Sequence, residues 1–305
     1  MPNLKEISRR IASIKSTMQI TRTMEMISTA KIRKALERAQ EAAPYKDAIK
    51  NMLANVANAG IDVNQPLLQE HEKEKTVLFI LIASDRGLAG GFNINLEREV
   101  MRAMQKLQRE GKQTLLITCG RKPTDYFNYR GVKPVMSFTG ISSEPTDDEA
   151  DHIASYAMDG YTSGSIDRIM IYYMHARNRM QQDEVREQLL PVRAEDLAIP
   201  NPPRSREAVS KVGQTMYTEF TFDPSATRVL GYLMPAYIRT VIFHALLDSA
   251  AAEHGARRRA MQSATDNAND MVTSLSRMYN RVRQSSITTE LNDIVGGASA
   301  LEDNN

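Results

Sequence analysis

The sequence predicts two long terminal helices that pair as an antiparallel coiled coil, with a central Rossmann-like α/β domain between them in the chain. Near both ends, apolar residues recur at alternating spacings of three and four. Between the ends, the pattern changes to short continuous apolar runs separated by amphipathic stretches. The 305 residues include no Trp and only 6% aromatic residues, with 17 Met, a composition that favours helices.

These changes of pattern divide the chain into three predicted parts. Residues 1–60 form an N-terminal coiled-coil helix, residues 75–215 form the α/β domain, and residues 216–305 form a C-terminal helix that pairs with the first. Near the end of the middle part, the stretch 199–204 (IPNPPR) is typical of a loop or linker.

The first helix is predicted over about 3–58, and Pro44 predicts a kink or a break in it. A second apolar stripe, formed by Ile20, Met24 and Ile27, indicates a second partner surface. The predicted seam weakens at the polar positions Thr21, Glu25 and Ser28, and its apolar positions are Leu4, Ile7, Ile11, Ile14, Met18, Ile32, Ala35, Ala39 and Ala42.

The last helix is predicted over about 224–301, with an early kink or short break at Pro235. Some 70 residues of helix span on the order of 100 Å, more than one globular domain needs, so we expect the helix to project. Its predicted seam consists of Met261, Ala264, Ala268, Met271, Leu275, Met278, Val282 and Ser285.

The middle of the chain predicts a parallel or mixed sheet with interleaved helices. One amphipathic helix runs through Val100, Met104 and Leu107, and another covers about 146–160. The predicted strands are 76–83, 114–119, 132–138, 166–175 and 185–192.

Basic residues concentrate at both ends of a chain whose net charge is only +2. Residues 1–40 hold nine Lys or Arg against three acids, and a second basic stretch covers 257–283. Such ends suit an acidic protein, nucleic acid or a membrane surface. Because the basic residues share helices with coiled-coil seams and have few aromatic neighbours, we favour a solvated or partner-facing helix face over a nucleic-acid site. We expect no membrane-spanning run, no signal or transit peptide and, with Cys119 alone, no internal disulfide.

The sequence predicts no catalytic, cofactor-binding or metal-binding residues. The turn over 84–93 (SDRGLAGGFN) follows a predicted strand and precedes a helix, where a phosphate could bind. It lacks the spacing of a P-loop or a dinucleotide fingerprint, so a structural turn is favoured. The five His residues lack metal-ligand spacing and are expected at the surface or in an interface.

The end of the C-terminal helix carries an apolar stripe of Ile287, Leu291 and Ile294. A bare apolar tip on a projecting helix would aggregate in water, which indicates an apolar sleeve supplied by another protein. A tip that folds back on its own domain is the alternative.

Several motifs closely resemble the gamma subunit family of F-type ATP synthases. In the N-terminal part they are 11–14 (IASI), 19–27 (QITRTMEMI) and 30–34 (AKIRK). In the C-terminal part they are 258–267 (RRAMQSATDN), 279–290 (YNRVRQSSITTE) and 293–301 (DIVGGASAL), and the turn at 84–93 is a third mark. The stretch 120–215 matches the family only in general layout.

The resemblance implies a non-catalytic rotor shaft without a cofactor. Three alpha and three beta subunits would surround it, and it would couple the rotation of the proton-driven c-ring to the conformational cycle of beta in ATP synthesis or hydrolysis. The implied partners further include epsilon, with delta, a and b in the same complex. No nucleic acid is implied, and the membrane is contacted only through the c-ring.

The resemblance also implies roles for individual residues. The residues implied to couple the shaft to the ring are Met24, Arg257, Arg283, Gln284, Thr288 and Glu290. Ile287, Leu291 and Ile294 would turn in an apolar bearing. Phe222 and Asp223 would lie in the foot near epsilon and the c-ring, where the family carries Glu in place of Asp223. Because the chloroplast insert with its two cysteines is absent, the resemblance implies a bacterial, peripheral protein on the cytoplasmic face of the plasma membrane.

Two other function classes follow from the same residues. A nucleotide-dependent enzyme would use the α/β domain and would bind ATP or NAD tightly as an isolated chain. A coiled-coil nucleic-acid or scaffold protein would show salt-sensitive DNA binding and would carry its basic residues along one exposed stripe.

Overall fold

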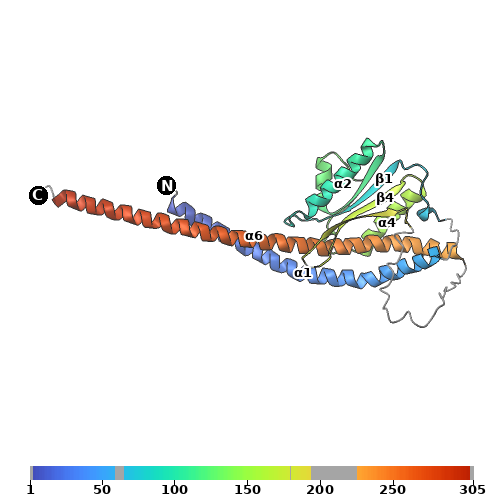
Figure 1. Ribbon diagram of the computed structural model, residues 1–305, viewed down its shortest axis with the longest axis horizontal. Helices are drawn as coiled ribbons and strands as arrows, with labels where there is room; N and C mark the ends of the chain where they lie inside the picture. Colours follow the sequence, from blue (N-terminus) through green and yellow to red (C-terminus); the bar gives the residue numbers. More distant parts are fainter. Residues whose placement is uncertain (1–2, 59–64, 179, 194–224, 303–305) are drawn as a thin grey trace, which may run out of the picture. The chain divides into compact units, whose positions relative to one another are not determined.

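The computed structural model describes residues 3–58, 65–178, 180–193 and 225–302 (Figure 1). They fall into two compact units, one within Met1–Thr29 and Arg257–Asn305 and the other within Ala30–Ala256. The elements in chain order are α1 (Leu4–Asn58), η1 (Pro66–Leu68), β1 (Thr76–Ile82), α2 (Phe92–Arg109), β2 (Gln113–Cys119), α3 (Arg121–Tyr129), β3 (Met136–Phe138), α4 (Asp147–Thr162), β4 (Arg168–His175), β5 (Asp183–Leu190) and α6 (Ala226–Glu302).

In the first unit, α1 and α6 pair antiparallel. The hydroxyls of Thr21 and Thr265 are hydrogen-bonded across the pair at 2.8 Å, while Ile14, earlier in α1, lines a shallow cavity with Leu275, later in α6. The predicted seam of α1 is confirmed through its polar positions, since Thr21 and Ser28 are both buried. The pairing of the two terminal helices therefore agrees with the sequence-based prediction.

The predicted seam of α6 is wrong at two positions. Met271 and Met278 are 54% and 46% exposed, whereas the next residue along, Val272 or Tyr279, is less exposed in each case. Both choices preserve steps of three and four from Ala268, so the spacing alone could not distinguish the two phases.

Neither proline inside the long helices breaks them, although the sequence predicted a kink or a break at each. Pro44 lies within α1 and Pro235 within α6. A helical proline removes the hydrogen bond to the carbonyl four residues earlier. Here those carbonyls belong to Gln40 and Gly231, which are exposed and therefore accessible to water.

The second unit contains a mixed five-stranded sheet in the order β3-β2-β1-β4-β5. The first four strands are parallel, with Phe79 paired to Leu116 on one side and to Met170 on the other. β5 runs antiparallel to β4 along one edge. The Rossmann-like sheet predicted from the apolar runs is thus confirmed, with an antiparallel edge strand added.

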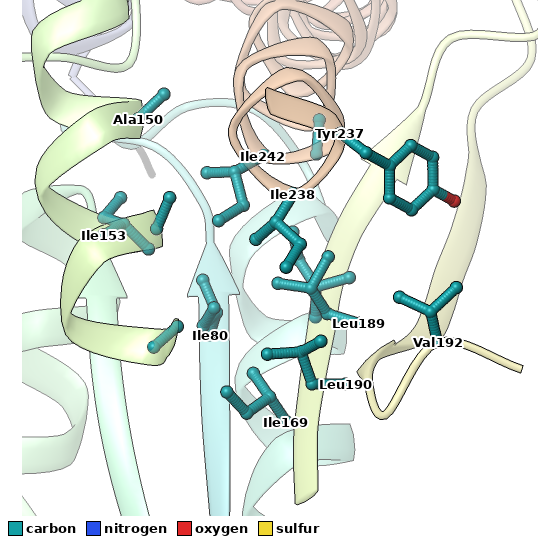
Figure 2. Packing of buried hydrophobic residues seen from close by; sticks show 14 of the residues in the cluster. Ile80, Ala150, Ile153, Ile169, Leu189, Leu190, Val192, Tyr237, Ile238 and Ile242 are labelled. Atoms are coloured by element: carbon teal, nitrogen blue, oxygen red, sulfur yellow. The ribbon is translucent and has the colours of Figure 1, made fainter. Parts of the chain in front are cut away.

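Side chains alternate between two cores on opposite faces of this sheet. Figure 2 shows the first, where Ile80 and Ile169 pack against Ile153 of α4 and Ile238 and Ile242 of α6. On the other face, Phe79 and Leu81 belong to a cluster with Leu96, Val100 and Met104 of α2. Every residue from Val77 to Ile82 is buried, which explains why the run of β1 is apolar without alternation.

Helix α3 was not predicted. Only Pro123 and Phe127 of its nine residues are buried, so the sequence RKPTDYFNY shows too short an apolar repeat to indicate a helix. The predicted strand over 132–138 forms only at Met136–Phe138, and that predicted over 185–192 begins two residues earlier, at Asp183.

One part of α6 differs from the expectation of no membrane-spanning run. Within Thr227–Val295, an 18-residue window reaches a mean hydropathy of 1.3, and a third of it is buried in the fold. By length and composition alone this helix is long and apolar enough to cross a membrane. Some apolar side chains of this helix, including Ile238 and Ile242, pack beneath the sheet.

We expect Gly120→Ala to destabilise the protein by at least about 3 kcal/mol. Gly120 has φ +112°, and a β-carbon there would lie 2.6 Å from the carbonyl oxygen of Ala83. Gly111→Ala is the matched control, since Gly111 also has a positive φ, +79°, but nothing within 4 Å. This control should lower the free energy of unfolding, measured in urea, by about 1 kcal/mol. Equal losses for the two variants would show that the close contact does not matter.

Candidate coupling surface and the glycine-rich turn

Within the first unit, α6 extends past the start of α1. Thr21 lies opposite Thr265 and α1 begins 17 residues before Thr21, so Leu4 lies opposite about position 282. Residues 283–302 of α6 therefore have no residue of α1 to pair with (Figure 1).

Most of the predicted site residues gather on one face of this unpaired segment. Their spacings place Arg283, Ile287, Leu291 and Ile294 along one side of the helix, with Gln284, Thr288 and Glu290 on its flanks. All seven are exposed. The Thr288 hydroxyl donates a hydrogen bond to the Gln284 carbonyl oxygen at 2.9 Å, so that it is satisfied within the helix.

The centre of this face is apolar. Ile287, Leu291 and Ile294 are 48%, 56% and 67% exposed, and Val295 beside them is 62% exposed. A continuous exposed stripe of large aliphatic side chains is typical of a surface that is covered in an assembly. The predicted stripe is therefore present, and in the part of the chain that the structure describes it does not fold back into the coiled coil.

The second stripe of α1 is also only partly covered. Ile20 and Ile27 are 58% and 52% exposed, and Met24 between them is half-buried. Since the seam of α1 uses Thr21 and Ser28, this stripe lies beside the seam and presents a second apolar surface in the same unit.

The other predicted site residues are placed differently. Arg257 is only 7% exposed and interacts with other groups of the chain, so its guanidinium is not a surface group in this structure. Phe222 and Asp223 lie outside the described residues.

Part of the basic surface of α1 is neutralised within the chain. In the second unit, the Lys34 ammonium contacts the Glu144 carboxylate at 3.1 Å. That hydrogen bond, with the charges of Lys34, Arg38 and Lys31, lowers the pKa of Glu144. Sequence reasoning expected a solvated or partner-facing basic surface, because nothing local indicates an acid 110 residues away.

In the second unit, the turn over 84–93 is held by its own side chains. The Asp85 carboxylate accepts hydrogen bonds from the backbone N–H groups of Arg121, Gly140 and Ser142 at 2.8 to 2.9 Å. The Asn93 side-chain oxygen accepts from the backbone and hydroxyl of Ser84 at 3.0 and 2.8 Å. Burial alone would raise the pKa of Asp85, but the bonds from Gly140, Ser142 and Arg121 hold it below its ordinary value.

This geometry explains what the turn does. Arg121 begins α3, and a helix N-terminus at the carboxyl end of parallel strands is where this class of fold binds phosphate. In this chain the Asp85 carboxylate uses that N–H group and ties together the loops that follow β1, β2 and β3. The arrangement supports the interpretation as a structural turn.

The sequence predicted that the histidines lie at the surface or in an interface, but the structure does not place all of them there. His254 is only 4% exposed within α6, and His71 stacks on Tyr161 while its Nδ1 contacts Asp167 at 2.8 Å. Across the described ranges, His, Cys, Asp and Glu form no group of three that could hold a metal. Burial raises the pKa of the Cys119 thiol, which keeps it unreactive.

We expect Asp85→Asn to destabilise the protein by about 1–3 kcal/mol at neutral pH, because an amide cannot accept three N–H bonds equally well. A carboxylate with a lowered pKa contributes stability above its unfolded pKa of about 4 and loses it as pH falls through the folded value. The difference in unfolding free energy between the wild type and Asp85→Asn, measured in urea, should therefore narrow below about pH 4. Asp125→Asn, at an exposed carboxylate 3.7 Å from Arg121, should change little. A difference in unfolding free energy that stays constant with pH would contradict the conclusion that Asp85 is a charged carboxylate.

Comparison with known proteins places the whole chain in one family. The family model described as ATP synthase matches residues 3–301. The ATP synthase gamma chain of Pelotomaculum thermopropionicum is 42% identical over 99% of this chain and 100% of its own length. The gamma chain of Symbiobacterium thermophilum is 40% identical over 98% of this chain and 99% of its own length.

A solved structure gives the same fold. A chain in the Euglena gracilis mitochondrial ATP synthase, from a structure of its OSCP, F1 and c-ring, aligns with a TM-score of 0.65 at 18% identity over 98% of this chain and 94% of that chain. The matched family and the paired terminal helices agree with each other. The chain belongs to the family of the ATP synthase gamma chain, the non-catalytic subunit that forms the central rotor stalk of the F-type ATP synthase.

Proposed function

We propose that the unpaired face of α6 over 283–295, with the Ile20–Met24–Ile27 stripe of α1, transmits torque to the catalytic ring. The observation that carries this proposal is the exposure of Ile287, Leu291 and Ile294 on a helix that has no partner in the described chain. An apolar stripe of this kind is stable in water only when another surface covers it. Membership of the gamma family supports the F1 sector of the membrane-associated enzyme as that surface.

The proposed partners are three alpha and three beta subunits around the coiled coil, with epsilon and the c-ring at the other end and delta, a and b in the same complex. The proposed location is the cytoplasmic face of a bacterial plasma membrane, in line with the bacterial relatives. We retain the division into 1–60, 75–215 and 216–305 as the proposed functional parts.

Individual residues have different proposed roles. Ile287, Leu291 and Ile294 turn in an apolar bearing, while Arg283, Gln284, Thr288 and Glu290 contact polar groups of the ring. Met24 and Arg257 couple the shaft to beta, and for the buried Arg257 this means shaping the shaft. Phe222 and Asp223 contact epsilon or the c-ring. The ring responds because each state of beta contacts a different side of the shaft, which is the differential interaction that any conformational driver requires.

Leu291→Asp should weaken the bearing, because the variant brings a charge into the proposed apolar sleeve. Burial of a leucine contributes about 1.5–3 kcal/mol, so assembly with the alpha and beta subunits should weaken roughly 10- to 100-fold. Reconstitution followed by native gel analysis measures this. Asn292→Asp adds the same charge about 100° around the helix from Leu291, off the apolar stripe, and should leave assembly unchanged. Normal assembly and rotation of Leu291→Asp would show that the tip is not enclosed.

Arg283→Ala with Gln284→Ala should lower coupling or assembly without changing nucleotide affinity of isolated beta. Both side chains are exposed, so their loss should not unfold the helix. ATP-driven proton pumping in inverted vesicles should fall several-fold, as expected when charge-assisted hydrogen bonds worth about 1.5–3 kcal/mol are removed from an interface. Wild-type ATPase and pumping rates in the assembled double variant would count against the assignment.

A further inference from the structure

A groove on the α2 side of the sheet is not used by the coupling role. It encloses about 590 Å³ between the end of α2 and strands β4 and β5, within the second unit. Phe79, Met170, Tyr172 and Leu107 form an apolar floor. Its volume is in the range typical of small-ligand sites, which combine an apolar wall with a few polar groups.

The rim of this groove is strongly basic. Two carboxylates, Glu110 and Glu187, also line it. The lining cations come from both sides and are Lys106, Lys112, Arg168, Arg186 and Arg193. Cations gathered in a concave site with a low-dielectric floor focus their field on an incoming anion.

Ion pairs behind the groove fix three of these cations in position. The Glu74 carboxylate contacts Lys112 at 2.9 Å and Arg168 at 3.1 Å. The Glu99 carboxylate contacts Arg186 at 2.6 Å. Such pairs reduce the charge of the rim but hold its donors in fixed positions, which lowers the entropy lost on binding.

Two cations remain without such a partner. Within the described ranges, neither Lys106 nor Arg193 forms an ion pair. They lie on opposite sides of the groove, one on α2 and the other three residues after β5. Their charges are therefore available to a ligand between them.

Arg168 adds a donor that lacks an acceptor. Its Nη2 faces Glu74, whereas its Nε is buried and has no hydrogen-bond partner among the described groups. Buried donors in native proteins are nearly always satisfied by protein, water or ligand. In a residue that lines the groove, this donor is suited to an oxygen of a bound anion.

We propose that the groove binds a small anion through a phosphate chain, either an inorganic oligophosphate or the chain of a nucleotide. Several cations converge on one compact cavity, which suits a ligand with several charges close together. Guanidinium forks match the spacing of phosphate oxygens. The site is separate from the turn over 84–93, where Asp85 already accepts the N–H groups of the neighbouring loops.

The test is isothermal titration of the full-length chain with pyrophosphate, triphosphate and ADP at low and at moderate salt. We expect one site per chain, with affinity that falls as salt rises. Lys106→Ala with Arg193→Ala should weaken binding at least about tenfold, the effect of losing one charge-assisted contact. Lys73→Ala with Lys133→Ala removes two exposed lysines outside the groove and should leave affinity unchanged.

Arg168→Lys separates the role of the buried donor from that of charge. It keeps a cation beside Glu74 but lacks the Nε donor, so we expect several-fold weaker binding with an unchanged circular dichroism spectrum. Equal affinity for pyrophosphate and ADP would show that the protein contacts only the phosphate chain. Tighter binding of ADP would show that its nucleoside also contacts the apolar floor of the groove.

Three results would overturn the proposal. The first is no binding of any of the three anions. The second is binding that the Lys106→Ala, Arg193→Ala variant retains in full, which would place the anion elsewhere. The third is binding of a poly-glutamate peptide in the groove without binding of phosphates, which would make it a docking surface for an acidic protein segment.

Discussion

The structure depends on the seam along which α1 and α6 pack. Neither helix forms a compact fold alone, because each must bury its apolar side chains against another element. In one unit the seam brings Ile7, Thr21 and Ser28 together with Met261 and Ala268. In the other, the same two helices supply Leu53 and Ile238 to the core beneath the sheet. A single pairing thus organises both the coiled coil and one face of the α/β domain.

Polar residues in the seam help to fix its register. Thr21 and Thr265 are hydrogen-bonded to each other across the helices, and a slip of one turn would break that bond. Purely apolar seams tolerate such slips more easily. The register decides where α1 ends opposite α6, and hence that the helix beyond about position 282 has no partner in its own chain. This hydrogen bond therefore contributes, with the apolar seam, to setting which surface is exposed for assembly.

The sequence predicted the features that arise from local periodicity and missed those that join distant residues. The long helices were predictable because a step of 3.6 residues follows from backbone geometry, and the apolar strands because a strand covered on both faces has a continuous apolar run. The choice between Met271 and Val272 for the seam was not, because both satisfy the spacing. The contacts of Asp85 with Arg121 and Gly140, and that of Lys34 with Glu144, join residues 36 to 110 positions apart. The site residues themselves came from resemblance, which could not reveal that Arg257 is buried.

In the α/β domain, internal hydrogen bonds occupy the place where such folds bind phosphate, which explains why this fold suits a rotor shaft. In a Rossmann-like sheet, the loops at the carboxyl ends of the strands normally remain open to bind a ligand. Here the Asp85 carboxylate closes them by bonding to the loops after β2 and β3. A loop cluster held by internal bonds loses little order when load is applied, whereas one that waits for a ligand would be compliant. A member of the gamma family must transmit torque without dissipating it, so stiffness at that edge of the sheet serves the function better than a binding site there.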